Sequence, residues 1–386
     1  MKIGGYKIDI WILIPVLLLL IFSIGLVYSA SSDYSISKFK DANYMFKLHL
    51  IKVLMALVLI FIFAKIDYKY YQKYSKWLIL MSLFFLVLVF IIGVSIKNVN
   101  RWINLGPVSF QPSDLAKYTL ILFVANLLVK QRNKITDLYK GYLPVILSIL
   151  TVCILVAAQP NFSTSLIIFG SSMLLLLISK VKFKHILITG ISLLPFAVIF
   201  ILTKSYIRNR IENYADFTSS GTAQHQLNQA IIGLGNGGIF GVGGGNSLQK
   251  QFFLPEAHGD FIFSIIGEEY GLLGTLAVIF LFALLLIRGY KVAKKIPDEY
   301  GKYVAFGITT VITAYAVVNM SVACGIIPTT GVPIPFISYG GTALIFNSIA
   351  VGILLNISSY RNESPEAFSD NSNLNGMLSE SNLKNV

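Results

Sequence analysis

LPEAHGDFIFSIIGEE, residues 254–269, is the stretch that decides the fold, because it ends a long polar segment and enters an apolar run that continues to about residue 287. Asp260 lies where that run begins, and Glu268 lies two turns deeper. At ~3.6 residues per turn, Asp260, Ser264 and Glu268 are expected near one face of a helix. Carboxylates at membrane depth are costly, so they usually face a cavity, a partner or a reaction. A structural alternative stays open here, with Asp260 as a helix N-cap and a buried glutamate, Glu268 or Glu269, paired with a loop Arg or Lys.

The composition is typical of a polytopic membrane protein. Of 386 residues, 55% are hydrophobic and 13% are charged, and the mean hydropathy is +0.72. This length leaves little room for a separate soluble domain. The net charge of +13 is spread through short loops between apolar runs. Because no basic stripe or stacking platform occurs, we expect no nucleic-acid partner, and the charge suits an anionic lipid surface instead.

Apolar stretches of spanning length predict about ten transmembrane helices, since each needs ~20 residues to cross a ~30 Å core. They lie near residues 9–30, 48–66, 77–96, 114–129, 141–158, 163–181, 184–203, 260–287, 303–325 and 338–357. The predicted fold is therefore an all-α polytopic membrane protein with a large extracellular loop, about 204–259, between helices 7 and 8. The first run is too long for a signal-peptide core, so we expect it to stay uncleaved. Residues 1–358 form the predicted membrane domain, and the Ser-, Asn- and Glu-rich residues 359–386 a disordered cytoplasmic tail.

Loop charges predict the orientation of the bundle. Lysines and arginines cluster in alternate connections, near residues 69–76, 130–140, 180–184 and 288–302. The positive-inside rule makes these connections and both termini cytoplasmic. The other connections hold most of the Gly and Pro residues, so function is expected at the outer face. The two cysteines, Cys153 and Cys324, lie in apolar runs and indicate packing rather than a disulfide or a metal site.

The first informative outer loop reads RWINLGPVSFQPSDLAK, residues 101–117. Its PSD triplet is a helix-start signal. Lys117 follows one turn inside the helix, where an unpaired ammonium is costly, and Asp114 at i−3 is its nearest partner. Two interpretations stay open: a structural ion pair beside an interfacial Arg101, or a cationic rim of Arg101 and Lys117 for an anionic headgroup or pyrophosphate.

Two later outer segments complete the candidate site. The large segment contains Arg210, becomes glycine-rich over 233–245 and leads to Lys250 and the 254–269 stretch. Dense glycine allows backbone close to a ligand or a mobile lid, although the signal is weak by itself. In PTTGVPIPFISYGG, residues 328–341, three prolines prevent a continuous helix. This pattern favours a re-entrant or interfacial loop beside a cavity over a plain linker.

These segments together resemble the SEDS family, the shape, elongation, division and sporulation proteins that polymerise peptidoglycan. The resemblance covers the chain to about residue 358 and rests on 101–117, the Gln159-Pro160 turn, 237–250, 254–269 and 328–341. The segment 246–258 looks closer to the division type, FtsW, or the sporulation type, SpoVE, than to the elongation type, RodA. Two residues depart from the usual pattern: Asn161 replaces an aspartate, and Asp114 replaces a glutamate.

The resemblance implies which residues carry the chemistry. Asp260 matches the essential outer-loop aspartate of the family and is the expected catalytic residue, acting as general base. Weaker candidates for a pyrophosphate and sugar cavity are Arg101, Lys117, Arg210, Lys250, Glu256, His258, Glu268, Ser338 and Tyr339. No metal-ligand spacing is visible, and a divalent cation, Mg²⁺ or Mn²⁺, is left open as a cofactor.

The implied activity is that of a peptidoglycan glycosyltransferase, a hexosyltransferase that polymerises lipid II at the outer face of the bacterial cytoplasmic membrane. The 4-hydroxyl of one sugar attacks the anomeric carbon of another, and undecaprenyl pyrophosphate leaves. A hydroxyl nucleophile needs a base, which Asp260 would supply. Arg101, Lys117, Arg210 or Lys250 would stabilise the charge on the pyrophosphate.

Implied partners are lipid II, a class B penicillin-binding protein transpeptidase and other membrane proteins of the divisome or of sporulation. Two other functions stay open: a flippase for lipid II, and a noncatalytic scaffold for the transpeptidase. Asp260 discriminates between them, because only the transferase needs its carboxylate for chemistry.

Overall fold

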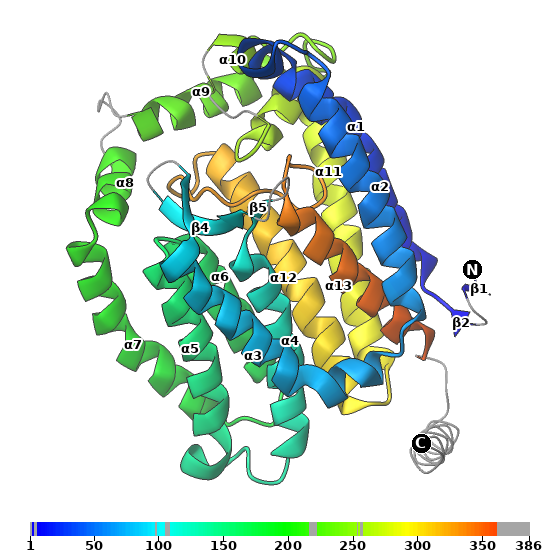
Figure 1. Cartoon of the computed structure of the whole chain (residues 1–386), viewed down its shortest axis with the longest axis vertical. Coiled ribbons are helices and arrows are strands. Elements are labelled where there is room, and N and C mark those ends of the chain that lie inside the picture. The colour runs from blue at the N-terminus through cyan, green and yellow to red at the C-terminus, as the bar shows by residue number, and fades with distance from the viewer. Residues whose placement is uncertain are drawn as a thin grey trace.

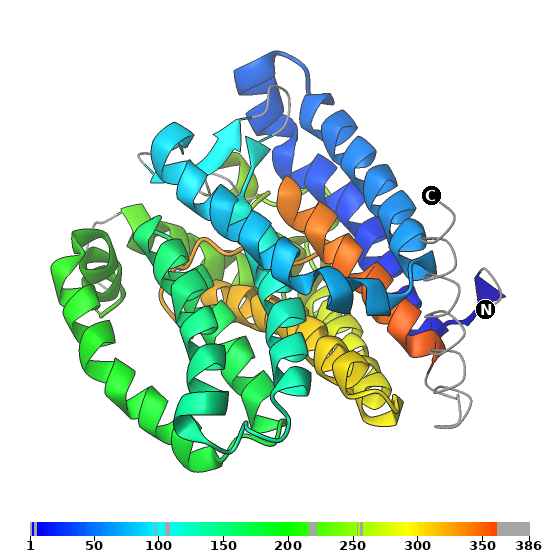
Figure 2. The same ribbon diagram turned by 60° about the horizontal axis from the view of Figure 1, so that its bottom comes forward.

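A computed structural model describes residues 2–3, 6–96, 99–104, 109–215, 222–252, 254 and 258–360 of the chain. Its helices form one tilted bundle (Figures 1 and 2). The bundle helices are α1 (Ile10–Phe39), α2 (Tyr44–Lys65), α3 (Tyr68–Ile92), α4 (Pro112–Lys130), α5 (Leu143–Ala158), α6 (Phe162–Leu177), α7 (Phe183–Thr203), α11 (Ile262–Lys295), α12 (Glu299–Ala323) and α13 (Thr342–Ser359). A π-helical turn, η1 (Leu138–Tyr142), leads into α5.

The prediction of about ten apolar helices is confirmed. Among the residues that the structure describes, nine helices are long and apolar enough to cross a membrane, and α6 is a shorter apolar helix. Some helices exceed the apolar runs that predicted them: α1 extends to Phe39 and α11 to Lys295. These extensions are polar or charged, so hydropathy alone could not place their ends.

Short hydrogen bonds between side chains connect the helices at the centre of the bundle. Tyr118 of α4 donates to Asn347 of α13 over 2.6 Å, and Thr119 of α4 donates to Ser82 of α3 over 3.0 Å. Polar side chains that pair across apolar helices stabilise a bundle in a medium that offers them no other partner. Helix α4 is thereby held between α3 and α13, and it carries Lys117 toward one end of the bundle.

We call one end of the bundle the loop face. It carries the strands β3 (Val94–Ile96), β4 (Val99–Asn104) and β5 (Ser109–Phe110), the helices α8 (Ser205–Ala215), α9 (Thr222–Asn236) and α10 (Gln249–Phe252), and the segment between α12 and α13. The three strands form an antiparallel sheet in the order β3-β4-β5. The large segment predicted as a loop is thus partly helical, because polar helices such as α8 lack the apolar run on which the prediction relied.

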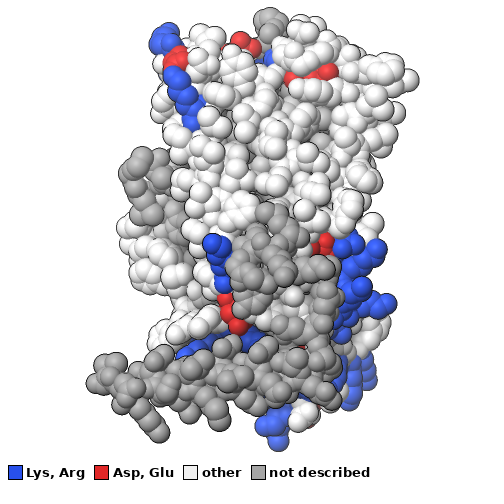
Figure 3. Space-filling model, turned by 90° about the vertical axis from the view of Figure 1, so that its right-hand side faces the viewer, with Lys and Arg blue, Asp and Glu red and all other residues white. Residues whose placement is uncertain are grey.

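The opposite end of the bundle carries the basic connections. The α2–α3, α4–α5, α6–α7 and α11–α12 turns lie at the lower end of Figure 1, as does the end of α13. Figure 3 shows most of the Lys and Arg surface in that view below a wide uncharged zone. The predicted gathering of these charges at one end is confirmed, and the assignment of that end to the cytoplasm stays a prediction. The predicted disordered tail lies outside the described residues from 361 onward.

The first residues of the bundle are fixed to its last helix at this end. The Asp9 backbone N–H donates to Ser358 Oγ over 2.9 Å, and Arg288 Nη2 donates to Asp9 Oδ2 over 2.6 Å. Asp9 also caps α1 by accepting from the Trp11 backbone N–H. An aspartate at an N-cap satisfies one of the free N–H groups of the first turn. A single carboxylate therefore sets the start of α1 and joins it to α11.

Candidate functional site

The segment between α12 and α13 is joined by hydrogen bonds to the turn that precedes α11. Asn319 Nδ2 donates to the carbonyl oxygens of Asp260, over 2.9 Å, and Val332, over 2.8 Å. Ser338 Oγ donates to the Gly259 carbonyl over 2.8 Å, and the Tyr339 N–H donates to the His258 carbonyl over 2.9 Å. Ser338, Tyr339 and His258 were predicted site residues, and the structure brings them together beside Asp260.

The proline-rich segment packs inside the protein, as its pattern predicted. Val332, Ile334, Phe336 and Ile337 are buried in the core. Irregular backbone of this kind is tolerated in a membrane protein where protein surrounds it. Gly331 adopts a φ of +69°, and a Cβ added there would lie 3.5 Å from Asp260 Oδ2. The Asp260 carboxylate therefore lies directly against this segment.

Asp260 does not share a helix with Glu268. Helix α11 begins at Ile262, and its N-cap is Phe261, which makes no side-chain capping bond. The prediction that Asp260, Ser264 and Glu268 share a helical face is therefore wrong. In the structural alternative, Asp260 as the N-cap is wrong too, whereas a buried glutamate paired with a cation is found, in Glu269 with Lys250. Asp260 lies in the turn before the helix, and its carboxylate lies against the Gly331 segment instead.

Two arginines lie near Asp260 and are held by backbone carbonyl groups. Arg101 of β4 donates to the carbonyl oxygens of Gln159 and Pro160 in the α5–α6 turn. Arg210 Nη1 of α8 donates to the Thr329 and Thr330 carbonyls over 3.3 and 3.4 Å. The turns around Gln159-Pro160 and 328–341 thus serve to position the two guanidinium groups.

The electrostatics link Arg101, Arg210 and Asp260 into one neighbourhood. Burial and the charge of Arg210 lower the pKa of Arg101 to about 10, while Tyr206 and Asp260 oppose that shift. Arg101 therefore stays charged at neutral pH. Burial raises the pKa of Tyr206, a residue of α8, and the charges of Arg101 and Arg210 oppose this shift. Tyr206 was missed from the sequence, because nothing in its neighbours distinguishes it from a surface aromatic residue.

Lys117 is buried in an ion pair below the Ser338 segment. Its Nζ lies 2.9 Å from Asp114 Oδ1, and its side chain is 1% exposed. Thr342 Oγ1 donates to the other Asp114 oxygen over 3.0 Å, and the Tyr315 ring lies 4.4 Å from the ammonium. A cavity of about 10 Å³, lined by Lys117 and Ser338 among others, leaves room for roughly one water. The predicted pairing is confirmed, and Asp114 is long enough to make it.

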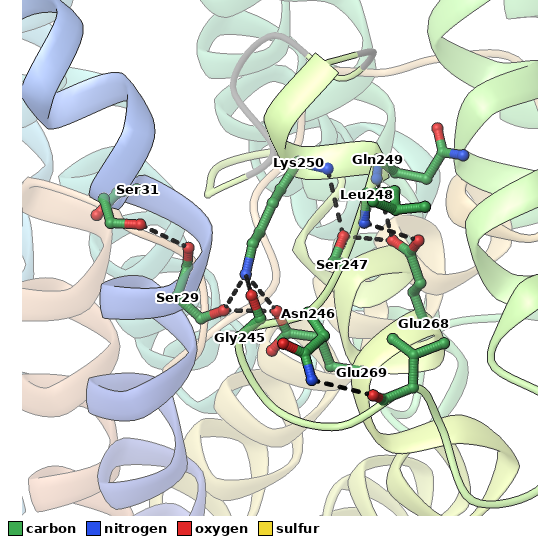
Figure 4. Close-up of polar contacts among 12 residues, drawn as sticks. Ser29, Ser31, Gly245, Asn246, Ser247, Leu248, Gln249, Lys250, Glu268 and Glu269 are labelled. Carbon is green, nitrogen blue, oxygen red and sulfur yellow. Dashed lines mark hydrogen bonds and ion pairs between the residues drawn. The ribbon is translucent and has the colours of Figure 1, made fainter.

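Lys250 forms a second buried ion pair, with Glu269 (Figure 4). Its ammonium lies 2.7 Å from Glu269 Oε1 and also donates to Ser29 Oγ and the Gly245 carbonyl, each over 2.7 Å. An ammonium has three hydrogens, and all three are used here. This geometry favours a structural role for Lys250, and its predicted role toward the substrate stays a prediction.

Glu268 fixes the start of α10. Its carboxylate accepts from Ser247 Oγ, from the Leu248 N–H over 3.1 Å and from the Gln249 N–H over 3.4 Å (Figure 4). A carboxylate that accepts several N–H bonds at a helix start is strongly stabilising. Glu268 thus acts on the loop face through α10 and does not meet Asp260 along a common helix. Glu256, also a predicted site residue, lies outside the described residues.

The glycine-rich segment packs against a break in α11. Gly271 interrupts the helix with φ +66° and ψ −160°. The backbone N–H groups of Val242 and Leu272 donate to the Glu268 and Gly238 carbonyls, each over 2.9 Å. A Cβ added at Gly241 would lie 2.2 Å from the Glu269 carbonyl oxygen. Glycine is thus needed at this position because two backbone segments meet. The sequence pattern could not distinguish this close approach from a loop that binds a ligand.

A metal would have few protein ligands here. No three His, Cys, Asp or Glu side chains form a possible metal-ligand group among the residues for which the structure gives positions.

Comparisons with known proteins agree over nearly the whole chain. The FtsW/RodA/SpoVE family model, described as cell cycle protein, matches residues 10–363. The probable peptidoglycan glycosyltransferase FtsW of Geobacter metallireducens is 37% identical over 365 residues, covering 93% of this chain and 96% of that protein. Stage V sporulation protein E of Bacillus subtilis is 36% identical over 358 residues, covering 91% and 97%.

Two solved structures share the fold. One, described as the structural coordination of polymerization and crosslinking by a peptidoglycan synthase complex, has a TM-score of 0.78 at 24% identity and covers 93% of this chain and 99% of that one. The rod shape determining protein RodA of Thermus thermophilus has a TM-score of 0.69 at 23% identity, with the same coverage of 93% and 99%.

Proposed function

Because this chain belongs to the FtsW/RodA/SpoVE family of cell cycle proteins and is a peptidoglycan glycosyltransferase, we propose that Asp260 is the general base of its reaction. The observation that carries this proposal is that the Asp260 carboxylate lies against Gly331, next to the carbonyls that hold Arg210, and interacts electrostatically with Arg101. A carboxylate at such a place can accept a proton while the neighbouring cations bind an anionic leaving group.

The proposed substrate is lipid II, and the step is a glycosyl transfer. The 4-hydroxyl oxygen of one disaccharide attacks the anomeric carbon of another, and its proton passes to the Asp260 carboxylate. The bond from the anomeric carbon to the pyrophosphate oxygen breaks, and undecaprenyl pyrophosphate leaves with that electron pair. A positioned base contributes about 10²–10⁴-fold to such a step.

Arg101 and Arg210 would stabilise the charge that develops on the pyrophosphate. Each is oriented by backbone carbonyls, so its position is set before the substrate binds. Preorganised cations of this kind need no rearrangement in the transition state. A guanidinium also presents N–H groups in a planar fork that fits phosphate oxygens. Lys117 and Lys250 already have carboxylate partners, which makes them weaker candidates for this contact.

The protein is a multi-pass membrane protein. We place its loop face on the outer side of the cytoplasmic membrane and both termini in the cytoplasm, because the basic connections gather at the opposite end. A class B transpeptidase is the proposed partner, since a similar structure is described as a complex that coordinates polymerization and crosslinking. A role in cell division or sporulation fits the named relatives.

The test is polymerisation of lipid II by the purified full-length chain, with and without the transpeptidase, for the wild type and Asp260→Asn. Asp41→Asn is a matched control, because Asp41 is a half-exposed carboxylate near the loop-face end of α2 that pairs with Lys47. We expect polymer from the wild type and the control and none from folded Asp260→Asn. Equal polymer from all three would remove Asp260 from the chemistry. Transport of lipid II without polymer from any of them would favour the flippase.

A further inference from the structure

Lys52 is a cation inside the membrane-spanning part of α2 that has no carboxylate partner among the residues the structure describes. It lies eight residues after Tyr44, which places it ~12 Å along the helix from the loop-face end. Among the described residues no carboxylate lies within 4.0 Å of its ammonium, whereas the Tyr339 ring centroid lies 3.9 Å away. An ammonium at this depth is costly unless it meets a partner, and it usually marks a site.

His49 lies one turn from Lys52 on the same side of α2, and it also has an unused polar atom. Its side chain is 0% exposed, and its Nε2 lies 3.0 Å from Ser23 Oγ. Ser23 Oγ gives its only proton to the Leu20 carbonyl over 2.7 Å, so Nε2 must be the donor to Ser23. Within the described part of the chain, His49 Nδ1 has no hydrogen-bond partner. With the proton on Nε2, Nδ1 is an acceptor only, and because buried polar atoms are nearly always partnered, it points to a donor such as an ordered water.

Tyr339 connects this pair to the candidate catalytic turn. The centroid of its ring lies 5.9 Å from that of the His49 ring and 5.7 Å from that of the His258 ring. Its backbone N–H donates to the His258 carbonyl over 2.9 Å, two residues before Asp260. Helices α2 and α13 pack along each other, with Tyr339 just before the start of α13 (Figure 1). Lys52 and His49 therefore approach the Asp260 turn from the membrane side, whereas the arginines approach it from the loop face.

We propose that Lys52 forms a subsite for the phosphoryl group of a polyprenyl-linked lipid, binding the phosphate nearer the hydrocarbon tail, while His49 Nδ1 accepts from a water that also donates to this phosphate. An anion reaches this depth only when an apolar chain anchors it, which excludes soluble phosphates. The Tyr339 ring holds the ammonium in place while leaving its hydrogens available to the anion. This inference rests on the proposed function for the identity of the lipid, and it divides the diphosphate between Lys52 on the tail side and the arginines on the sugar side.

The experiment measures binding of undecaprenyl pyrophosphate to the full-length chain in nanodiscs of neutral lipid, for the wild type, Lys52→Gln, Lys52→Arg and Lys65→Gln. Lys65 is the matched control, because it is an exposed lysine at the other end of the same helix. We expect Lys52→Gln to weaken binding by about tenfold or more, as loss of a charge-assisted hydrogen bond does. Lys52→Arg is expected to restore most of the affinity, and Lys65→Gln to bind as the wild type does.

Competition identifies the lipid that supplies the phosphate. Phosphatidylglycerol should displace the pyrophosphate lipid only weakly, and equal displacement by it would instead identify a bilayer lipid as the occupant. Wild-type affinity in folded Lys52→Gln would overturn the subsite. If Lys52→Gln does not fold, His49→Gln tests it, because the glutamine amide can still donate to Ser23 but lacks the Nδ1 position. The experiment measures binding and not turnover, so its result does not depend on whether the Asp260→Asn variant polymerises lipid II.

Discussion

Lys250 Nζ lies 2.7 Å from Glu269 Oε1, and the two side chains are 3% and 0% exposed. Ser29 Oγ of α1 donates to the same carboxylate oxygen over 2.5 Å, so one buried pair joins α1, α10 and α11 (Figure 4). Lys250 also donates to the carbonyl of Gly245, at the end of the glycine-rich segment. The pair thus holds α10 and the end of the glycine-rich segment against α1 and α11.

Replacing one partner of this pair should destabilise the protein more than replacing both. Lys250→Met leaves a buried carboxylate uncompensated, which costs about 3–5 kcal/mol. The double variant Lys250→Met with Glu269→Leu removes both charges and should recover most of that loss. Thermal unfolding in detergent measures both. A single variant as stable as the wild type would mean that water reaches Glu269 and that the loop face is open there.

Arg210→Ala should lower the turnover number by about 10²–10³-fold, the loss typical of removing one preorganised donor to a developing charge. Arg208 supplies the control, since it lies two residues away on α8, is exposed and pairs only weakly with Glu212 over 3.5 Å. Arg208→Ala should therefore leave turnover near that of the wild type. Equal losses in the two variants would indicate a general effect of charge on α8 rather than contact with the reaction.

Local patterns in the sequence predicted the apolar helices and one part of the site. The pairing of Asp114 with Lys117 followed from their i,i+3 spacing, because a helix brings such residues together without help from the rest of the fold. The contact between Tyr339 and His258 joins two segments that are distant in the chain. Only the resemblance of their motifs to the family suggested that both belong to the site.

Other parts of the site could not be predicted. Asp260 was placed on a helical face because the apolar run begins beside it, yet the hydrogen bond from Asn319 to its carbonyl keeps it in a turn. Lys52 and His49 lie within a run that reads simply as a spanning helix, and only the packing of α2 against Tyr339 distinguishes them. Tyr206 lies in a helix that hydropathy does not reveal.

Two glycines of the same segment should respond oppositely to alanine. Gly241 has φ +83°, and an added Cβ would lie 2.2 Å from the Glu269 carbonyl oxygen. Gly241→Ala therefore has to move backbone as well as adopt a left-handed conformation that costs roughly 1–2 kcal/mol by itself. Gly235 lies in α9 with nothing within 4 Å of an added Cβ. Gly235→Ala should be neutral or stabilise by up to about 1 kcal/mol. Unfolding temperatures that fall equally in both variants would contradict the close backbone approach.

Glu268→Gln should loosen α10 without unfolding the bundle. The carboxylate accepts from Ser247 Oγ and from the Leu248 and Gln249 N–H groups, whereas a glutamine amide has only one acceptor oxygen and its NH₂ would face these donors. Loss of charge-assisted bonds of this kind costs about 1.5–3 kcal/mol each. Amide hydrogen exchange should therefore accelerate at Leu248 and Gln249, while exchange in α12 stays as in the wild type.

The loss of Glu268 should also weaken the contact between Lys250 and Glu269, because Lys250 directly follows the residues that Glu268 holds. The effects of Glu268→Gln and Lys250→Met on the free energy of unfolding should therefore be less than additive. Full additivity would mean that the two carboxylates hold the loop face independently.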